Sequence, residues 1–242
     1  MKKKNRFWIS PLIIIMGLLF LAGFCQKDDD DDTPGEITDK DGNVYTSVII
    51  GTQEWMAENL KTTKYNDGTD IPLVTDDHEW IELTTGAYCW YNNDAATYKT
   101  PYGALYNWYA VNTGKLCPTG WHIPTDEEWK QLEMYLGMSQ ADANNTGWRG
   151  TDEGGKLKEA GNSHWDSPNT GATNESGFSA LPGGYRETSG SFLYTDLGGD
   201  YWSASQYLSG SAWSRLLHYN FSNIRRDGLD KHFGFSIRCV RN

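Results

Sequence analysis

Few side chains in this sequence have the type and spacing that chemistry requires, and the 4 cysteines are the most reactive of them. Cys25 follows an apolar run, while Cys89, Cys117 and Cys239 are spread over the rest of the chain. Thiols can be acylated, oxidised to disulfides or used as metal ligands. No Cys-x-x-Cys pair or histidine-rich spacing accompanies them, so the sequence indicates neither a zinc site nor a redox dithiol.

The position of Cys25 indicates lipidation at the end of a secretion signal. Basic residues open the chain, and an apolar run over 7–24 ends in a small Ala-Gly pair and Phe24. A basic flank before a short apolar core is typical of a secretion signal, and two acyl chains on Cys25 would give firm membrane anchoring. We therefore expect residues 1–24 to be a lipoprotein signal peptide. The alternative is an uncleaved signal anchor with Cys25 as a bystander, because Phe24 stands where a small residue is usual.

Residues 25–38 are expected to form a lipidated acidic tether, because a run of aspartates follows Lys27. Like charges repel and the run has nothing apolar to bury, so it should be extended and solvated. Calcium binding is a weaker interpretation, since a flexible run of carboxylates lacks a preformed cage. The segment that starts Cys25-Gln26-Lys27-Asp28 resembles the surface-export signal of lipoproteins in Bacteroidetes-type bacteria. That resemblance implies a lipid-anchored protein of the outer membrane, exposed at the cell surface.

Residues 39–242 are enough for one domain. A net charge of −11 argues against nucleic acid as a partner. The chain has 11 Trp, 14 Tyr and 26 Gly, which favours short strands, tight turns and long ordered loops with indole rings in the core. Export favours disulfides, and we predict a Cys117–Cys239 bond, because Cys239 lies in the expected final strand and Cys117 opens the turn before the main helix. Cys89 is left as a small buried residue.

Two other motifs that could carry chemistry are better explained by local structure. Residues 39–43 have the Asp-x-Asp-Gly-Asn pattern that begins a calcium loop, but Ile50 replaces the downstream glutamate, so a hairpin turn is expected. Gly183 and Gly184 lack the strand-loop-helix context of a phosphate loop and indicate a tight backbone turn. No metal site, cofactor or catalytic residue is predicted.

Two main helices are expected to position the rest of the chain. Apolar residues recur at helical spacing between 103 and 112. A second helix should begin after Thr125, which forms a Thr-x-x-Glu capping box with Glu128, and should end at Gly137. Acids in its first turn favour the helix dipole and so have a structural role.

Strands are expected mainly in the second half of the chain. An early strand over 44–50 is followed by a turn and strand over 51–55. Polar segments over 61–85 and 144–177 are predicted to be loops. Later strands are expected over 178–186, 199–205, 212–217 and 234–241. Early helices and late strands indicate an α+β fold with short antiparallel strands and long ordered loops.

The motifs VIIGTQEWMAENL at 48–60, YGALYNW at 102–108, CPTGWHIPT at 117–125, LPGGYR at 181–186 and YWSAS at 201–205 occur in one order. Together with the ending at 234–241, they resemble the Fibrobacter succinogenes major paralogous domain family. The resemblance covers nearly all of residues 39–242 and implies a single C-type-lectin-like domain, allied to the formylglycine-generating fold.

The chemistry of those allied proteins is not supported by the residues present. The calcium-site motifs of sugar-binding lectins are missing, since the nearest string is 166–169 and no Trp-Asn-Asp follows. Residues 216–235 contain no cysteine, so the copper-thiolate site of formylglycine-generating enzymes is not supported. The 5 histidines do not form the His-x-x-x-His-x-Glu motif of iron-dependent relatives. His122 is interpreted as a hydrogen-bonded core residue.

These observations favour a non-catalytic binding or adhesion module for a glycan or a surface protein. Aromatic side chains could stack on sugar rings while polar side chains hydrogen-bond the hydroxyls. The candidate ligand-binding residues are Trp148, Trp165, Tyr185, Arg186 and Asp200, each of which could pack in the core instead. The alternatives are a cell-surface enzyme acting on glycan or protein, which a deep cleft with two convergent ionisable groups would favour, and a structural surface protein with no small ligand.

Overall fold

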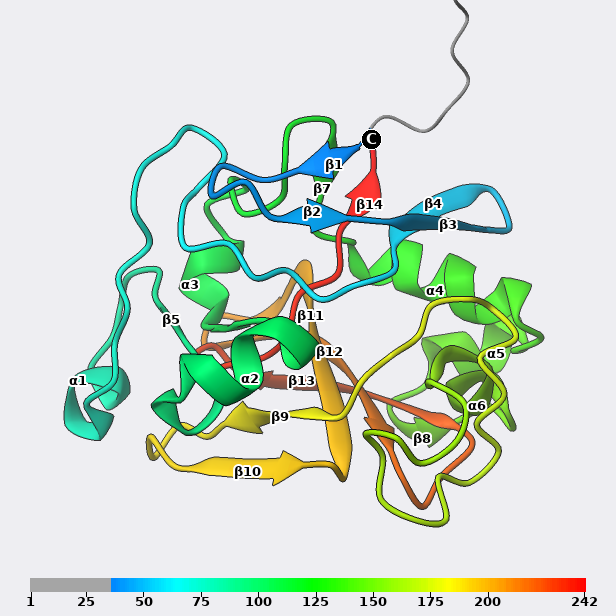
Figure 1. Cartoon of the computed structure of the whole chain (residues 1–242). Helices are drawn as coiled ribbons and strands as arrows, with labels where there is room; N and C mark the ends of the chain where they lie inside the picture. Colours follow the sequence, from blue (N-terminus) through cyan, green and yellow to red (C-terminus); the bar gives the residue numbers. More distant parts are fainter. Residues whose placement is uncertain (1–35) are drawn as a thin grey trace, which may run out of the picture. The chain divides into compact units, whose positions relative to one another are not determined.

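A six-stranded sheet is the largest element of the computed structural model, which describes residues 36–242 (Figure 1). Its strand order is β10-β9-β11-β12-β13-β8, and every neighbouring pair is antiparallel except β9 and β11. The strands are β8 Gly147–Arg149, β9 Gly183–Arg186, β10 Phe192–Thr195, β11 Gly198–Leu208, β12 Ser211–His218 and β13 Ile224–Asp230. The expected strands over 199–205 and 212–217 are thus confirmed within β11 and β12.

Smaller sheets pair the two ends of the described chain. A four-stranded sheet has the order β3-β4-β14-β7, and β1-β2 and β5-β6 form two-stranded sheets. Their bounds are β1 Ile37–Thr38, β2 Val44–Tyr45, β3 Ser47–Ile50, β4 Gln53–Met56, β5 Tyr88–Cys89, β6 Leu105–Tyr106, β7 Trp121–His122 and β14 Val240–Arg241. The turn predicted over 39–43 joins β1 to β2, where the Asp39 carboxylate accepts hydrogen bonds from the backbone of Asp41 and Asn43.

The α+β prediction is confirmed, but the expectation of two main helices is wrong. Six short α-helices and one 3-10 helix occur in residues 36–242. They are α1 Asp77–Ile81, η1 Tyr91–Asn93, α2 Ala95–Tyr102, α3 Trp108–Val111, α4 Asp126–Tyr135, α5 Gln140–Asn144 and α6 Glu153–Leu157. Four of the six α-helices, α1, α2, α5 and α6, lie outside the two predicted helices, and so does η1. Aspartate or serine N-caps start α1, α2 and α5, and these helices are too short to show apolar periodicity in the sequence.

Local signals that were strong in the sequence set the bounds of α4. The Thr125 hydroxyl accepts from the Glu128 amide, and the Glu128 carboxylate accepts from the Thr125 amide, so the predicted capping box is confirmed.

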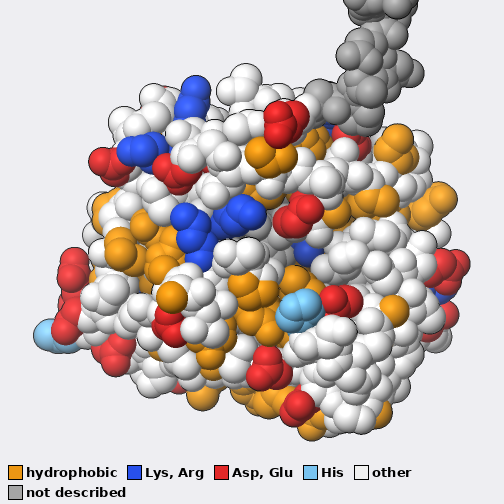
Figure 2. Space-filling model, viewed as in Figure 1, with side chains coloured by type: hydrophobic (Ala, Val, Ile, Leu, Met, Phe, Trp, Pro, Cys, Tyr) orange, Lys and Arg blue, Asp and Glu red, His pale blue; other side chains and the backbone are white. Residues whose placement is uncertain are grey.

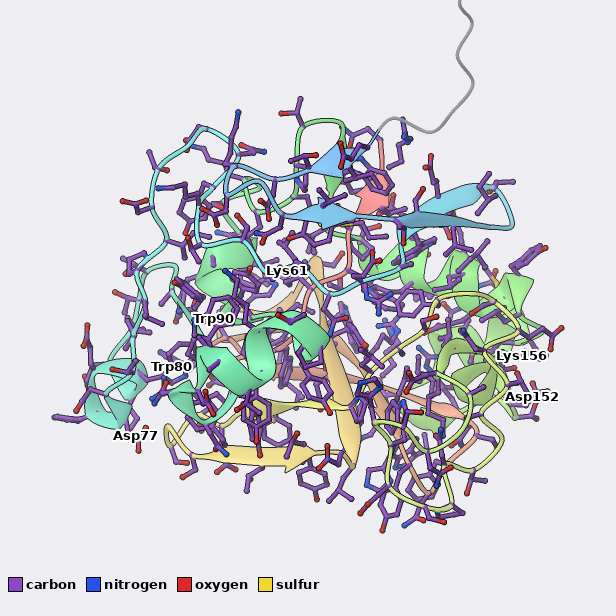
Figure 3. The ribbon with its side chains drawn as sticks, in the orientation of Figure 1. Lys61, Asp77, Trp80, Trp90, Asp152 and Lys156 are labelled. Atoms are coloured by element: carbon purple, nitrogen blue, oxygen red, sulfur yellow. A yellow bond between two sulfur atoms is a disulfide. The ribbon has the colours of Figure 1, made fainter. Side chains whose placement is uncertain are left out.

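The predicted loops and the predicted final strand, which rest on weaker sequence signals, differ from the structure. The segment 61–85 contains α1, the segment 144–177 contains β8 and α6, and strand pairing in 234–241 is limited to β14 and isolated bridges. Asp152 and Lys156 form an ion pair at 3.1 Å on α6, at the edge of the molecule in Figure 3.

Indole and phenol rings fill the core, as the composition indicated. One cluster surrounds Trp202 and Phe235, whose ring centroids are 4.4 Å apart, and a second joins Trp55, Trp129 and Phe178. The predicted disulfide between Cys117 and Cys239 is present, and Cys89 is a buried free thiol. The core clusters and the disulfide join both ends of residues 36–242, so we expect this segment to fold when it is produced by itself.

A buried ionic network holds α4 against the sheet. Glu133 accepts hydrogen bonds from Arg149 and Arg215, and Asp126 accepts from Arg215 at 2.9 Å and from Arg226 at 2.6 Å. Burial would raise the pKa of Asp126, but hydrogen bonds and charges from Arg226 and Arg215 outweigh burial and lower it to about 2. The first-turn acid Asp126 therefore has a structural role, and its main partners are arginines of the sheet.

The surface mixes charge types. On the face seen in Figure 2, acidic side chains are scattered over the middle and the edges, and a group of basic side chains lies near the middle, where Figure 3 labels Lys61. The predicted signal peptide, the lipidation site Cys25 and residues 25–35 of the predicted tether lie outside the described residues. The end of that tether does fold, since β1 begins at Ile37.

Candidate functional site

The alternation of side chains along β12 gives the large sheet two different faces. Arg215 and Leu217 point to the face covered by α4, where Arg215 joins the ionic network and Leu217 enters the core cluster of Trp129. Ser214, Leu216 and His218 belong to the opposite face, because successive strand residues point in opposite directions. That opposite face is hollowed.

Strand β13 repeats the pattern and extends the hollow face. Ile224 and Arg226 are buried on the α4 side, whereas Arg225, Asp227 and Leu229 line the hollow. The register pairs Leu216 of β12 with Arg225, so the two sets lie side by side.

The hollow is a cavity of about 370 Å³, within the usual size range of small-ligand sites. All six strands of the large sheet contribute to it, and so do the turn after β12 and the segment after β13. Its lining residues are Trp148, Tyr185, Tyr194, Asp200, Ser214, Leu216, His218, Phe221, Arg225, Asp227, Leu229, Phe233 and Phe235.

Aromatic rings line the cavity in two neighbouring groups. In one group, Tyr185 stacks on Tyr194 at 5.5 Å and meets Phe233 and Phe235 edge-on at 5.8 and 5.9 Å. In the other group, Trp148 packs on Phe221 at 4.4 Å between centroids, and His218 lies 5.4 Å from Phe221 and 6.0 Å from Tyr194. The most exposed of these rings are Tyr194 at 43% and Phe221 at 41%. Partly exposed rings beside a cavity can supply flat contact area to a ligand.

Asp200 of β11 is the only acid of the cavity lining that is fully buried, at 3% exposure. Its carboxyl makes no hydrogen bond to any described residue, and Oδ2 is fully shielded from solvent. Burial raises the pKa of Asp200 to about 8, and the charge of Arg225 opposes that rise only in part. Most buried polar atoms in proteins have a partner, and an unpaired carboxyl in a cleft is a frequent mark of a functional site.

The other charged groups of the cavity are already paired. Arg225 donates from Nε to the Asp227 carboxylate, and both side chains are partly exposed. Burial lowers the pKa of His218, and the positive charge of Lys158 adds to that effect. The Lys158 ammonium donates to the backbone carbonyls of Thr170, His218 and Phe221 at 3.0, 3.1 and 2.9 Å, so it fixes the turn that carries two walls of the cavity.

Replacing Asp200 with asparagine should change how stability depends on pH. The folded-state pKa of about 8 lies above the ordinary 3.8, so the neutral carboxyl stabilises the fold most below pH 4 and that contribution is lost as pH rises toward 8. At about 1.4 kcal/mol per pKa unit, Asp200→Asn should gain about 2–4 kcal/mol at pH 7 relative to its effect at pH 4. Urea unfolding at both pH values measures the change, and an equal effect at both would contradict it.

The structure brings three of the five sequence-predicted ligand residues to this cavity, namely Trp148, Tyr185 and Asp200. Trp165 and Arg186 lie elsewhere and are buried. The Trp165 indole donates to the Ala180 carbonyl at 3.0 Å, and Arg186 donates to the carbonyls of Val74, Thr75 and Gly190 and to Asp77. Neither side chain is placed to reach a ligand in the cavity, so we leave both out of the site.

Arg186 instead fastens α1 to the sheet. Its guanidinium lies over the Trp80 ring at 4.5 Å, and the Trp80 indole donates to the His232 carbonyl at 2.8 Å. Figure 3 labels Asp77 and Trp80 on this helix. A buried arginine with this many partners is a structural residue.

Sequence reasoning missed most of the cavity. It did not include His218, Phe221, Arg225 or Asp227 among the candidate ligand-binding residues, and it placed no strand over 224–230. The signal available was the alternation of residues 214, 216 and 218 with 225, 227 and 229 in two adjacent strands. His122, interpreted as a core residue, is hydrogen-bonded to Glu128 and Asn242 as expected but is partly exposed.

Residues 36–242 contain no helix with the length and apolar character needed to cross a membrane. Within the same residues, no group of three or more His, Cys, Asp or Glu side chains is arranged to hold a metal ion. A family model described as Fibrobacter succinogenes major domain matches residues 48–241. No curated protein and no solved structure gives a significant match.

Proposed function

This chain belongs to the Fibrobacter succinogenes major domain family, and from that premise we propose that it is a surface-exposed lipoprotein whose domain binds a sugar unit of an extracellular glycan. The observation that carries the proposal is the cavity on the open face of the large sheet, enclosed by aromatic rings around Asp200. The anchoring part rests on the sequence of residues 1–38. The C-type-lectin-like fold that the resemblance implies is part of the same proposal, supported by an α+β domain with mostly antiparallel strands.

The chemistry of the cavity suits a sugar ring. The C–H face of a pyranose packs against flat aromatic rings, and Tyr194 and Phe221 offer partly exposed rings in the cavity lining. Hydroxyl groups need donors and acceptors, which Asp200, Asp227 and Arg225 supply in one enclosed space. The open sheet face leaves room for the rest of the glycan to remain in solvent.

We expect residues 36–242 to bind specific glycans on an array, and the binding should survive a calcium chelator because the cavity contacts are aromatic and hydrogen-bonding. Tyr194→Ala should weaken binding about tenfold, since a buried ring contact contributes about 1–2 kcal/mol. Tyr207→Ala is the matched control, because Tyr207 is 45% exposed, close to the 43% of Tyr194, but does not line the cavity.

Three results would count against this proposal. The first is equal binding by both tyrosine variants, which would place the site elsewhere. The second is binding that disappears with chelator, which would indicate a cation-mediated site. The third is the lack of any bound glycan, which would favour a protein as the ligand of the domain.

A second function is favoured by one specific observation, the presence of both Asp200 and Asp227 in the cavity lining. Burial keeps Asp200 protonated at neutral pH, as a general acid requires, and Asp227 could act as the base or nucleophile. A glycan that binds should then be cleaved slowly, with new reducing ends appearing. Asp200→Asn would abolish cleavage in that case, whereas a bound glycan that stays intact over long incubation supports binding alone.

A further inference from the structure

The carboxyl group of Asp200 has no hydrogen-bond partner among the described residues. The residue is 3% exposed, it lines the cavity, and no described residue donates a hydrogen bond to its side chain. Nearly all buried carboxyl groups in native proteins are hydrogen-bonded or paired with a cation. A ligand that enters the cavity can supply the missing donor.

No cation of the described protein is free to serve this carboxyl. From β13, Arg225 is engaged with Asp227, and from β12 the only titratable lining group is His218, whose pKa is lowered by burial. Lys158 lies behind His218 with three carbonyl partners. The remaining titratable groups facing Asp200 are the phenols of Tyr185 on β9 and Tyr194 on β10; burial raises the pKa of Tyr185 to about 12, so it is neutral.

The walls next to Asp200 favour positive charge. Tyr185, Phe233 and Phe235 form a cluster of three rings whose centroids lie 5.3 to 5.9 Å apart. The face of an aromatic ring carries partial negative charge and attracts ammonium groups, more strongly where water is excluded. A neutral hydroxyl would gain a hydrogen bond from Asp200 but would lack the charge attraction of an ammonium group to the ring faces.

We propose that the ligand of this cavity carries a protonated amine that pairs with the Asp200 carboxylate inside the aromatic cluster. The inference rests on the proposed function and narrows the sugar to an amino sugar with a free ammonium group. The Arg225–Asp227 pair contributes no net charge, so an ammonium beside ionised Asp200 leaves the cavity neutral.

Binding of an ammonium ligand should release a measurable number of protons from the protein. At pH 6.5 the free Asp200 carboxyl is mostly protonated, because burial raises its pKa to about 8. An ammonium ligand stabilises the ionised form, so each binding event releases close to one proton to the buffer. A ligand that binds the neutral carboxyl releases none.

The test is calorimetric titration of residues 36–242 at pH 6.5 with glucosamine, N-acetylglucosamine and glucose. Repeating each titration in two buffers of different ionisation enthalpy gives the number of protons released. We expect glucosamine to bind at least tenfold more tightly than glucose, with about one proton released. Asp200→Asn should remove both the preference and the proton release. Asp230→Asn, an acid of β13 that does not line the cavity, is the matched control.

The possible outcomes separate the two proposals. Equal affinity for all three sugars without proton release would overturn the ammonium inference and leave sugar binding intact. Binding of a non-sugar amine such as ethanolamine or lysine methyl ester, with proton release and without sugar binding, would support the ammonium inference and overturn the sugar function. Failure of every ligand would overturn both. Proton release is measured on the native protein, so the result does not depend on whether a variant folds.

Discussion

Glu133→Gln is expected to lower the free energy of unfolding by about 3–5 kcal/mol, the usual cost of removing one partner from a buried ion pair. Glu133 is fully buried on α4, where it compensates the guanidinium groups of Arg149 and Arg215. The uncharged amide would leave Arg149 without the carboxylate that it pairs with and Arg215 with Asp126 alone. Urea unfolding should show the loss, and the melting temperature should fall by about 10 °C.

Helix α4 also supplies the control for that experiment. Glu127 is on the same helix, and its carboxylate binds Lys130 at 2.8 Å, but its side chain is 74% exposed. Its partner Lys130 is buried but keeps Asp126 at 3.4 Å as a second carboxylate. An ion pair with an exposed partner contributes at most about 1 kcal/mol, so Glu127→Gln should be close to neutral. Similar losses in the two variants would mean that the effect comes from the helix and not from the buried network.

Reduction of the Cys117–Cys239 disulfide should cost about 3–5 kcal/mol. The bond joins residues separated by 122 positions, so it removes a large amount of freedom from the unfolded chain. It also ties the segment before α4 to the segment before β14. The midpoint of urea unfolding, measured with and without reductant, should show the loss.

The variant Cys117→Ala/Cys239→Ala provides the reference for that measurement. It should be as unstable as the reduced native protein and should not respond to reductant. A further response in the variant would trace the effect to a different thiol. Cys89 is the remaining cysteine in residues 36–242, and burial raises the pKa of its thiol to about 12, so it should react slowly in the folded state.

The parts of the fold that sequence predicted are those determined by neighbouring residues. The capping box of Thr125 and Glu128 needs only a four-residue window, and the turn over 39–43 needs five residues. Strand β13 was not predicted, because its charged residues lie on both faces of the sheet and have different partners there. Arg226 reaches Asp126 in the buried network, while Arg225 and Asp227 face the cavity, so the strand has no apolar alternation to detect.

The candidate site shows the same division. Tyr185 was chosen as an aromatic residue that could stack on a sugar ring and Asp200 as a polar residue that could hydrogen-bond its hydroxyls, and the structure places both in one cavity. Arg186 had the same local character, but its partners Val74, Thr75 and Asp77 lie more than a hundred residues earlier and bury it. Contacts with residues distant in sequence decide which aromatic or charged side chains are buried. Local sequence patterns do not contain that information.

Lys158 stabilises one wall of the cavity without a metal ion. Many loop-rich domains hold a turn in place with a bound metal ion that is coordinated by backbone carbonyls. Here the ammonium of a covalently attached side chain takes that role for the turn carrying His218 and Phe221. An internal cation of this kind cannot diffuse away or be stripped by a chelator, so this wall should keep its shape wherever calcium is scarce. Because burial lowers the pKa of Lys158 to about 8, the environment that would loosen the turn is an alkaline one.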